Sequence, residues 1–178
     1  MSSLALASTA PRRRPAADLP RPLRTFLATG AGLVTVATGT ALARVATGWA
    51  PYGFALREVA LAIHLAAVLP AIPLGAWVLL AGKGGARHRM LGKVWLALML
   101  VAALSALGIR HLNDGRLSPV HLLVPVVLVG AWRVISSARA GNLVRHRRAV
   151  VGLFAGGLLV PGLIAFMPGR LMWAWLLG

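Results

Sequence analysis

Cysteine is absent from the 178-residue sequence, and only three residues, Asp18, Glu58 and Asp114, are acidic. The lack of cysteine excludes a disulfide framework, a thiolate metal site and a cysteine nucleophile. The shortage of carboxylates excludes paired-carboxylate hydrolysis and carboxylate-rich metal sites. None of the three acids lies in the middle of an apolar stretch, where proton relays and cation-coupled transporters usually place one. The sequence also has no Gly-x-Ser-x-Gly motif for serine hydrolase chemistry.

The chain is rich in apolar residues instead. They make up 58% of it, charged residues make up only 12%, and the mean hydropathy is +0.79. A soluble domain of this length needs more polar residues to cover its surface, whereas one helical crossing of a bilayer needs about 20 consecutive apolar residues. The sequence therefore predicts an all-α integral membrane bundle. Its five predicted transmembrane helices are roughly 23–43, 59–80, 90–109, 117–138 and 149–167.

The two ends of the chain differ from the five apolar stretches. Residues 1–22 are rich in Pro, Ala, Ser and Arg and have no apolar period, which predicts a disordered basic cytoplasmic tail before a membrane domain of residues 23–178. The last segment, Arg170–Gly178, carries Trp173 and Trp175. Because tryptophan rings favour the membrane interface, this segment is predicted to lie at the membrane surface.

The net charge of +16 comes from 19 Lys and Arg residues, which occur in short blocks between the apolar stretches. This placement argues against nucleic-acid binding, and it is typical of the loops of multi-pass membrane proteins. With the N-terminus inside, 14 of the 19 fall on the inner side. The five on the outer side are Arg44, Arg57, Arg110, Arg116 and Arg170. The bias predicts a multi-pass protein of the cell membrane with a cytoplasmic N-terminus, and the lipid bilayer as its surroundings.

Histidine is the remaining residue type that could carry chemistry. His64 and His121 are predicted near the outer ends of the second and fourth spans, and His88 and His146 at the inner ends of the third and fifth. A b-type haem is held by two imidazoles from facing helices. His64 with His121, and His88 with His146, would therefore hold two haem b groups and give an electron path across the membrane, which requires a redox partner. His111 is interpreted as a solvated loop residue.

A glycine and arginine pattern accompanies these histidines. Gly75 follows His64 by 11 residues, and Gly157 follows His146 by 11. Because this spacing is close to three helical turns, each glycine shares a face with its histidine and would leave room for the opposite haem. Arg89 and Arg147, each directly after a histidine, would pair with haem propionates.

A simpler interpretation stays open for each of these residues. Histidines near headgroups are often only interfacial, glycines in spans often only allow close packing, and arginines obey the positive-inside rule without a cofactor. His64 is the strongest candidate, because a histidine inside a span is usually functional or partnered. Zinc is disfavoured, since it requires three or four ligands at one depth. The alternative is a non-catalytic membrane subunit, scaffold or small transporter without haem.

Five short motifs carry a resemblance to a known family. They are HLAAVLPAIPLG from His64 to Gly75, RHRMLGKVW around His88, SPVHLL around His121, SSARAGNLVRHRR around His146, and the closing MPGR. Over about residues 58–178 the sequence resembles the bacterial predicted membrane proteins called domain of unknown function 2306. Val150 departs from the pattern, which is expected to have methionine there. The resemblance implies no activity.

The transmembrane di-haem cytochromes b, the ascorbate-dependent ferric reductases, offer a weaker, architectural likeness. Those proteins place histidine pairs on their second and fourth, and third and fifth, helices. The likeness implies the same two pairs here, on the strength of architecture alone.

Overall fold

The computed structural model describes residues 19–51, 58–81, 84–110 and 116–178. Five long apolar segments in it are helical and long enough to cross a membrane, as predicted. The first three are α1 (Arg21–Ala46), α2 (Val59–Leu80) and α3 (Ala86–Ala106). The fourth span joins a 3-10 turn, η3 (Pro119–Leu122), to α4 (Leu123–Arg139). The fifth is continuous through α5 (Leu143–Phe154), the π-helical turn η4 (Ala155–Leu159) and α6 (Val160–Ala165).

Helices whose first turns contain charged residues begin earlier in the chain than hydropathy predicts. The fifth span starts at Leu143 instead of near residue 149, because Asn142 caps it by accepting a hydrogen bond from the Arg145 N–H at 2.9 Å. Gly141, at φ 64°, makes the tight turn before this cap. At the other end of the chain, α1 includes the last residues of the predicted tail, and residues 1–18 of that tail lie outside the described part.

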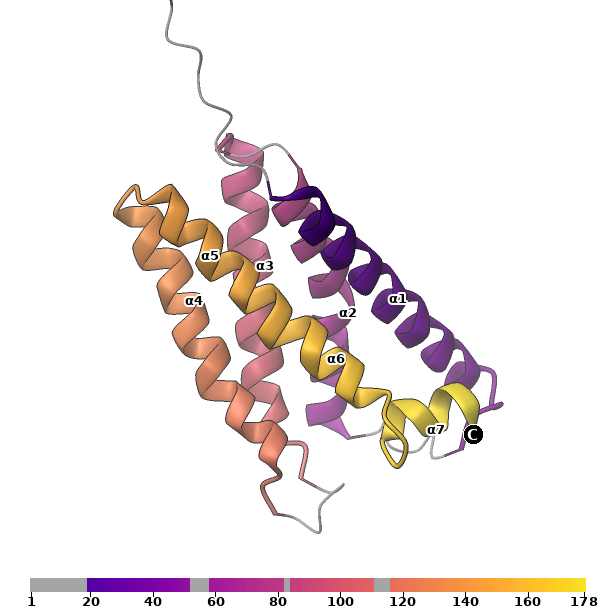
Figure 1. The fold of residues 1–178 in the computed structure, drawn as a ribbon. Coiled ribbons are helices and arrows are strands. Elements are labelled where there is room, and N and C mark those ends of the chain that lie inside the picture. The colour runs from indigo at the N-terminus through magenta and orange to yellow at the C-terminus, as the bar shows by residue number, and fades with distance from the viewer. Residues whose placement is uncertain (1–18, 52–57, 82–83, 111–115) are drawn as a thin grey trace, which may run out of the picture.

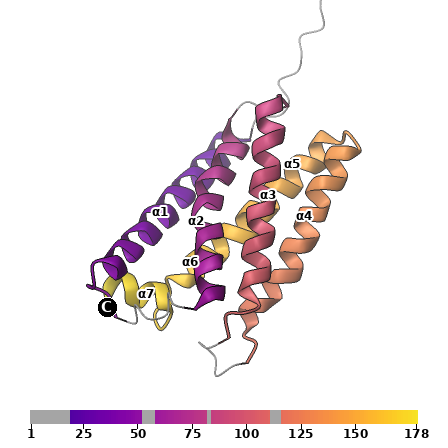
Figure 2. The ribbon, with the colours of Figure 1, turned by 180° about the vertical axis from the view of Figure 1, so that it is seen from behind.

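The first four spans lie side by side in chain order, from α1 to α4, and form one layer (Figures 1 and 2). The fifth span crosses one face of this layer diagonally, from beside α4 toward α1 (Figure 1). Its middle, η4, contacts α1, α2 and α4. A single helix therefore holds the layer together across its width.

The π-helical turn in the fifth span has a local cause. Pro161 lies in the first turn of α6, and its backbone nitrogen has no hydrogen to donate to the preceding turn. Its ring also crowds the carbonyl four residues earlier, at Gly157. The backbone widens over Ala155–Leu159 to accommodate this, which is a common origin of π-turns and bends in helices.

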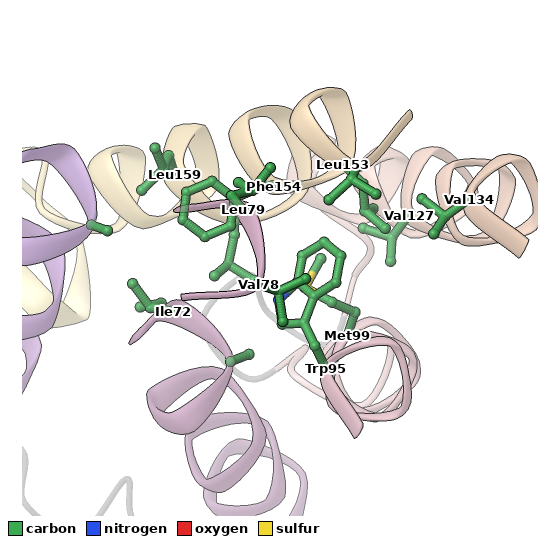
Figure 3. Close-up of a cluster of buried hydrophobic side chains, with 14 of the residues drawn as sticks. Ile72, Val78, Leu79, Trp95, Met99, Val127, Val134, Leu153, Phe154 and Leu159 are labelled. Carbon is green, nitrogen blue, oxygen red and sulfur yellow. The ribbon is translucent and has the colours of Figure 1, made fainter. Parts of the chain in front are cut away.

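The core lies between the layer and the crossing helix. The side chains of Ile72, Trp95, Met99 and Phe154 are almost completely buried there, and they come from α2, α3 and α5 (Figure 3). The Trp95 and Phe154 ring centroids are 6.4 Å apart, with the rings tilted by 46°. This separation is within the range at which aromatic pairs attract each other.

Gly75 of α2 is the position that lets these two rings meet. A Cβ at Gly75 would lie 2.5 Å from the Trp95 Nε1 atom and 2.7 Å from the Phe154 Cδ2 atom. Real Cβ atoms do not approach other atoms this closely, so the site admits only glycine without movement of both rings. Gly75 therefore provides space for side chains of the protein itself.

The outer surface of the spans is apolar. Large hydrophobic side chains such as Phe26, Leu33, Val94, Leu104 and Val126 are more than two-fifths exposed. Exposure of this kind is expected where a helix faces lipid chains instead of water. The fold class predicted from the sequence, an all-α membrane bundle of five spans, is confirmed.

The last segment differs from its prediction in one of its two tryptophan rings, and its place at the membrane surface stays a prediction. It forms a short helix, α7 (Leu171–Leu177), whose Trp175 side chain is fully buried with Met172 in a second core cluster against Ala41, Leu61 and Leu65. Arg44, near the end of α1, holds it in place. Its Nε donates to the Trp175 carbonyl at 3.1 Å and its Nη2 donates to the Gly178 carbonyl at 2.8 Å. Trp175 is therefore a core residue and not a ring in the interfacial belt, whereas Trp173 is 38% exposed.

Gly75→Ala should destabilise the protein by about 1–3 kcal/mol, because the added methyl group forces the Trp95 and Phe154 rings apart. Thermal unfolding in detergent micelles measures the effect. Gly32→Ala in α1 is the matched control, since no atom lies within 4 Å of its Cβ position and alanine favours the helix. Equal unfolding midpoints for the two variants would contradict the packing at Gly75.

Candidate functional site at the histidines

Four histidines lie in the described part of the chain, and each is half-buried. They are His64 in α2, His88 in α3, His121 in η3 and His146 in α5. His111 lies outside the described residues. The hydrogen bonds of the rings decide which nitrogen atoms are free to bind a metal.

His64 connects α2 to α3. Its Nδ1 lies 2.8 Å from the Ala102 carbonyl oxygen, and the Ser105 hydroxyl is 3.4 Å away. Because a carbonyl can only accept, Nδ1 carries the proton and donates it to Ala102. The Nε2 atom is then unprotonated and has a free lone pair. A neutral imidazole binds iron or zinc through such a nitrogen. The bond joins residues 38 positions apart, so it also fixes how α2 lies on α3.

His146 has the same arrangement at the opposite end of the bundle. Its Nδ1 lies 3.0 Å from the Val134 carbonyl oxygen, so α5 donates a hydrogen bond to α4. In both cases an otherwise costly polar group inside the span is satisfied by a backbone carbonyl of the neighbouring helix. Hydrogen bonds of this type stabilise helix pairs in membranes.

His121 makes its hydrogen bonds within its own turn. The Ser118 N–H donates to its Nδ1 at 2.9 Å, and this reciprocal pairing forms a capping box at the start of η3. The Ser118 hydroxyl and carbonyl oxygens also lie within reach of Nδ1, at 3.2 and 3.1 Å. The Nε2 atom is buried and makes no hydrogen bond within the described residues. Ser118 thus holds the ring through Nδ1.

His88 lies in the first turn of α3, among arginines. The adjacent Arg89 donates from Nη1 to the Gly84 carbonyl at 2.8 Å, which closes the turn between α2 and α3. Arg87 places its guanidinium carbon 4.9 Å from the centroid of the Trp77 ring, a cation–π contact. Arg147 is half-buried on α5 beside His146. Arg87 and Arg89 therefore stabilise the end of the bundle that holds the α2–α3 turn.

The helices of one predicted pair, His64 with His121, are separated by α3. The helices α2 and α4 lie on opposite sides of α3 in the layer, and His64 makes its hydrogen bond to α3 (Figure 2). His121 makes its hydrogen bonds to Ser118, within its own turn. His64 and His121 thus have different neighbours, and α3 lies between their helices.

The space predicted for haem is filled by protein. Trp95 and Phe154 occupy the region beside Gly75. At Gly157 a Cβ would lie 3.1 Å from both Met99 Cε and Val127 Cγ2. A macrocycle therefore does not fit between α2 and α5 unless these side chains move. Among the described residues, no three His, Cys, Asp or Glu side chains gather at one point.

The sequence pattern missed the partners of these histidines. The backbone carbonyls of Ala102 and Val134 hold His64 and His146, and the Ser105 hydroxyl lies near His64. Because every residue type has a backbone carbonyl, the sequence does not show which carbonyl a histidine will contact. Only Ser118, three residues before His121 in SPVHLL, matches a recognisable capping spacing.

These features define the chain as a multi-pass helical membrane protein with a packed interior. Within that class it belongs to the family described as predicted membrane protein DUF2306, whose model matches residues 61–167. The match covers α2 to α6 and leaves α1, α7 and the MPGR motif beyond Met167 outside it. No curated protein and no solved structure matches the chain.

The variants His64→Asn and His64→Leu separate the hydrogen bond of Nδ1 to Ala102 from any role of Nε2. An asparagine amide places a donor near the Nδ1 position, so it should retain the bond to Ala102 and stay close to wild-type stability. Leucine should cost about 0.5–2 kcal/mol, because it removes the donor. Thermal unfolding of both variants in detergent gives the comparison. If asparagine destabilises as much as leucine, the hydrogen bond to α3 does not account for His64.

Proposed function

We propose that the protein is a non-catalytic, haem-free membrane subunit or scaffold in which the histidines join the helices. The observation that carries this proposal is the hydrogen bonding of the rings. His64 and His146 donate to carbonyls of neighbouring helices, and His121 caps its own turn. Three of the four described histidines are thus accounted for by the fold.

The distribution of charge supports a structural role. Glu58, at the start of α2, is the single carboxylate side chain among the residues that the structure describes. A proton relay or a cation pathway through these spans would need acidic groups within the membrane. The filled space around Gly75 adds a second reason, because it leaves the centre of the protein to aromatic packing.

Transmembrane electron transfer through b-type haem is the second candidate. One observation favours it: the His64 and His146 rings each present an unprotonated Nε2, with Nδ1 fixed by a carbonyl as in many metal-binding histidines. His121 and His88 would complete the two pairs, and Arg89 and Arg147 would bind propionates. This candidate ranks second because it requires that His121 leave its contacts with Ser118 and that Trp95 and Phe154 be displaced.

The absorption spectrum decides between the two. Protein expressed with a supply of haem precursor and purified in detergent should show no reduced-minus-oxidised haem band, and a haem assay should find far less than one haem per chain. His64→Asn should behave identically. A stoichiometric haem that is lost in His64→Asn, which keeps the Nδ1 donor but has no Nε2, would overturn the proposal.

The Lys and Arg bias supports insertion in the cell membrane with the N-terminus in the cytoplasm. The end of the bundle with the α2–α3 and α4–α5 turns is then cytoplasmic, and α7 faces outward. A fluorescent protein that folds only in the cytoplasm should be bright when fused before Met1. Alkaline phosphatase, active only outside, should be active when fused after Gly178. The reverse pattern of activities would contradict this orientation.

A further inference from the structure

An open groove of about 440 Å³ runs between α4 and α5. Pro125, Val126, Val129 and Arg133 line it from α4, and Ala149 and Gly152 line it from α5. Val126, Val129 and Arg133 are exposed, so the groove opens on the outer surface of the bundle. The two helices are closest near the α4–α5 turn and diverge toward the other end (Figure 1).

Small residues explain why the groove persists between packed helices. The helices are held together by the bond from His146 to Val134 and by Leu153, which packs on Gly130 where both residues line the groove. On the groove side, a Cβ at Gly152 would meet no atom within 4 Å. The missing side chain at this position leaves room for a chain of methylene groups alongside the valines.

Arg133 gives the groove a charged end. It lies six residues before the end of α4, about 9 Å along the helix axis from that end. Its guanidinium makes no hydrogen bond or ion pair within the part of the chain that the structure describes; only its carbonyl accepts, from Ser136 and Ser137. The described carboxylate, Glu58, begins α2 at the opposite end of the bundle. The guanidinium is therefore available to an anion that enters the groove.

Two more arginines continue the charged end on α5. Arg145 lies four residues before Ala149, and Arg148 lies four before Gly152, so both extend the α5 wall of the groove by one turn. Both are exposed. The groove therefore has an apolar body along Pro125–Val129 and Arg133 at one end, with Arg145 and Arg148 one turn beyond its α5 wall.

We propose that this groove binds one anionic phospholipid, with its phosphate on the Arg133 guanidinium and one acyl chain along Val126 and Val129 beside Gly152. The occupant follows from charge and shape together. Guanidinium groups bind phosphate oxygens in a bidentate manner, and basic pockets between spans on the cytoplasmic side bind anionic headgroups. The site is separate from the histidines and does not depend on their role.

Four proteins test the proposal: the wild type, Arg133→Gln, Gly152→Leu and the control Arg139→Gln. Gly152→Leu fills the groove and keeps every charge, and it should fold because nothing lies within 4 Å of that Cβ. Arg139 lies at the same end of α4 but does not line the groove. Each protein, delipidated in neutral detergent, is titrated with phosphatidylglycerol, phosphatidylcholine or inorganic phosphate, and bound lipid is counted by native mass spectrometry.

The wild type and Arg139→Gln should bind one phosphatidylglycerol with equal affinity, and phosphatidylcholine more weakly. Arg133→Gln and Gly152→Leu should bind phosphatidylglycerol at least about tenfold more weakly, as expected for loss of a charged contact or of the acyl site. Equal binding of phosphatidylglycerol by all four proteins would mean that the lipid is attracted by the overall positive charge and not by the groove, and would overturn the proposal. Equal affinity for phosphatidylcholine, or competition by inorganic phosphate alone at the same concentration, would also overturn it.

Discussion

The contact of Trp95 and Phe154 over Gly75 sets the relative positions of α2, α3 and α5. The fifth span crosses the layer at this point, and the two rings reach each other because α2 has no side chain there. A larger residue would push α5 away from α2, and η4 would then lose its contacts to the layer. In a bilayer, where apolar burial gives helices little reason to associate, such close contact between helices is a main source of their affinity.

Hydrogen bonds between helices act alongside this packing. The His64 bond joins α2 to α3, and the His146 bond joins α4 to α5. Each bond satisfies a polar group that would otherwise be unpaired in an apolar medium. Each bond also forms only when the helix has one particular orientation about its own axis. Packing sets the distance between helices, and these bonds set their rotation. The same bonds leave an Nε2 lone pair at either end of the bundle, which is why structural and metal-binding roles share one geometry.

Most of the fold could be predicted from the sequence, because the length of an apolar run is dictated by the thickness of the bilayer. The start of the fifth span could not, since hydropathy falls at Arg145, Arg147 and Arg148 while the Asn142 cap still begins the helix. For the site, the interpretation of Gly75 as a packing glycine agrees with its close contact with the Trp95 and Phe154 rings. The sequence could not identify these rings as its neighbours, because they come from two other helices. The order of the helices in the layer is also invisible in hydropathy, and it is this order that separates His64 from His121.

The clasp of Arg44 on α7 joins residues that are 131 and 134 positions apart in the sequence. During synthesis α1 is inserted first, and the carbonyls of Trp175 and Gly178 reach the Arg44 guanidinium only after every later span, whereas the Trp49 carbonyl lies 3.3 Å from it within the same segment. Until then Ala41 and Leu61 lack the buried Trp175 ring that completes their cluster. The clasp is therefore a closing step in assembly, and a chain that stalls before α7 would hold an incomplete second core cluster, with Arg44 bonded only to Trp49 among the described residues.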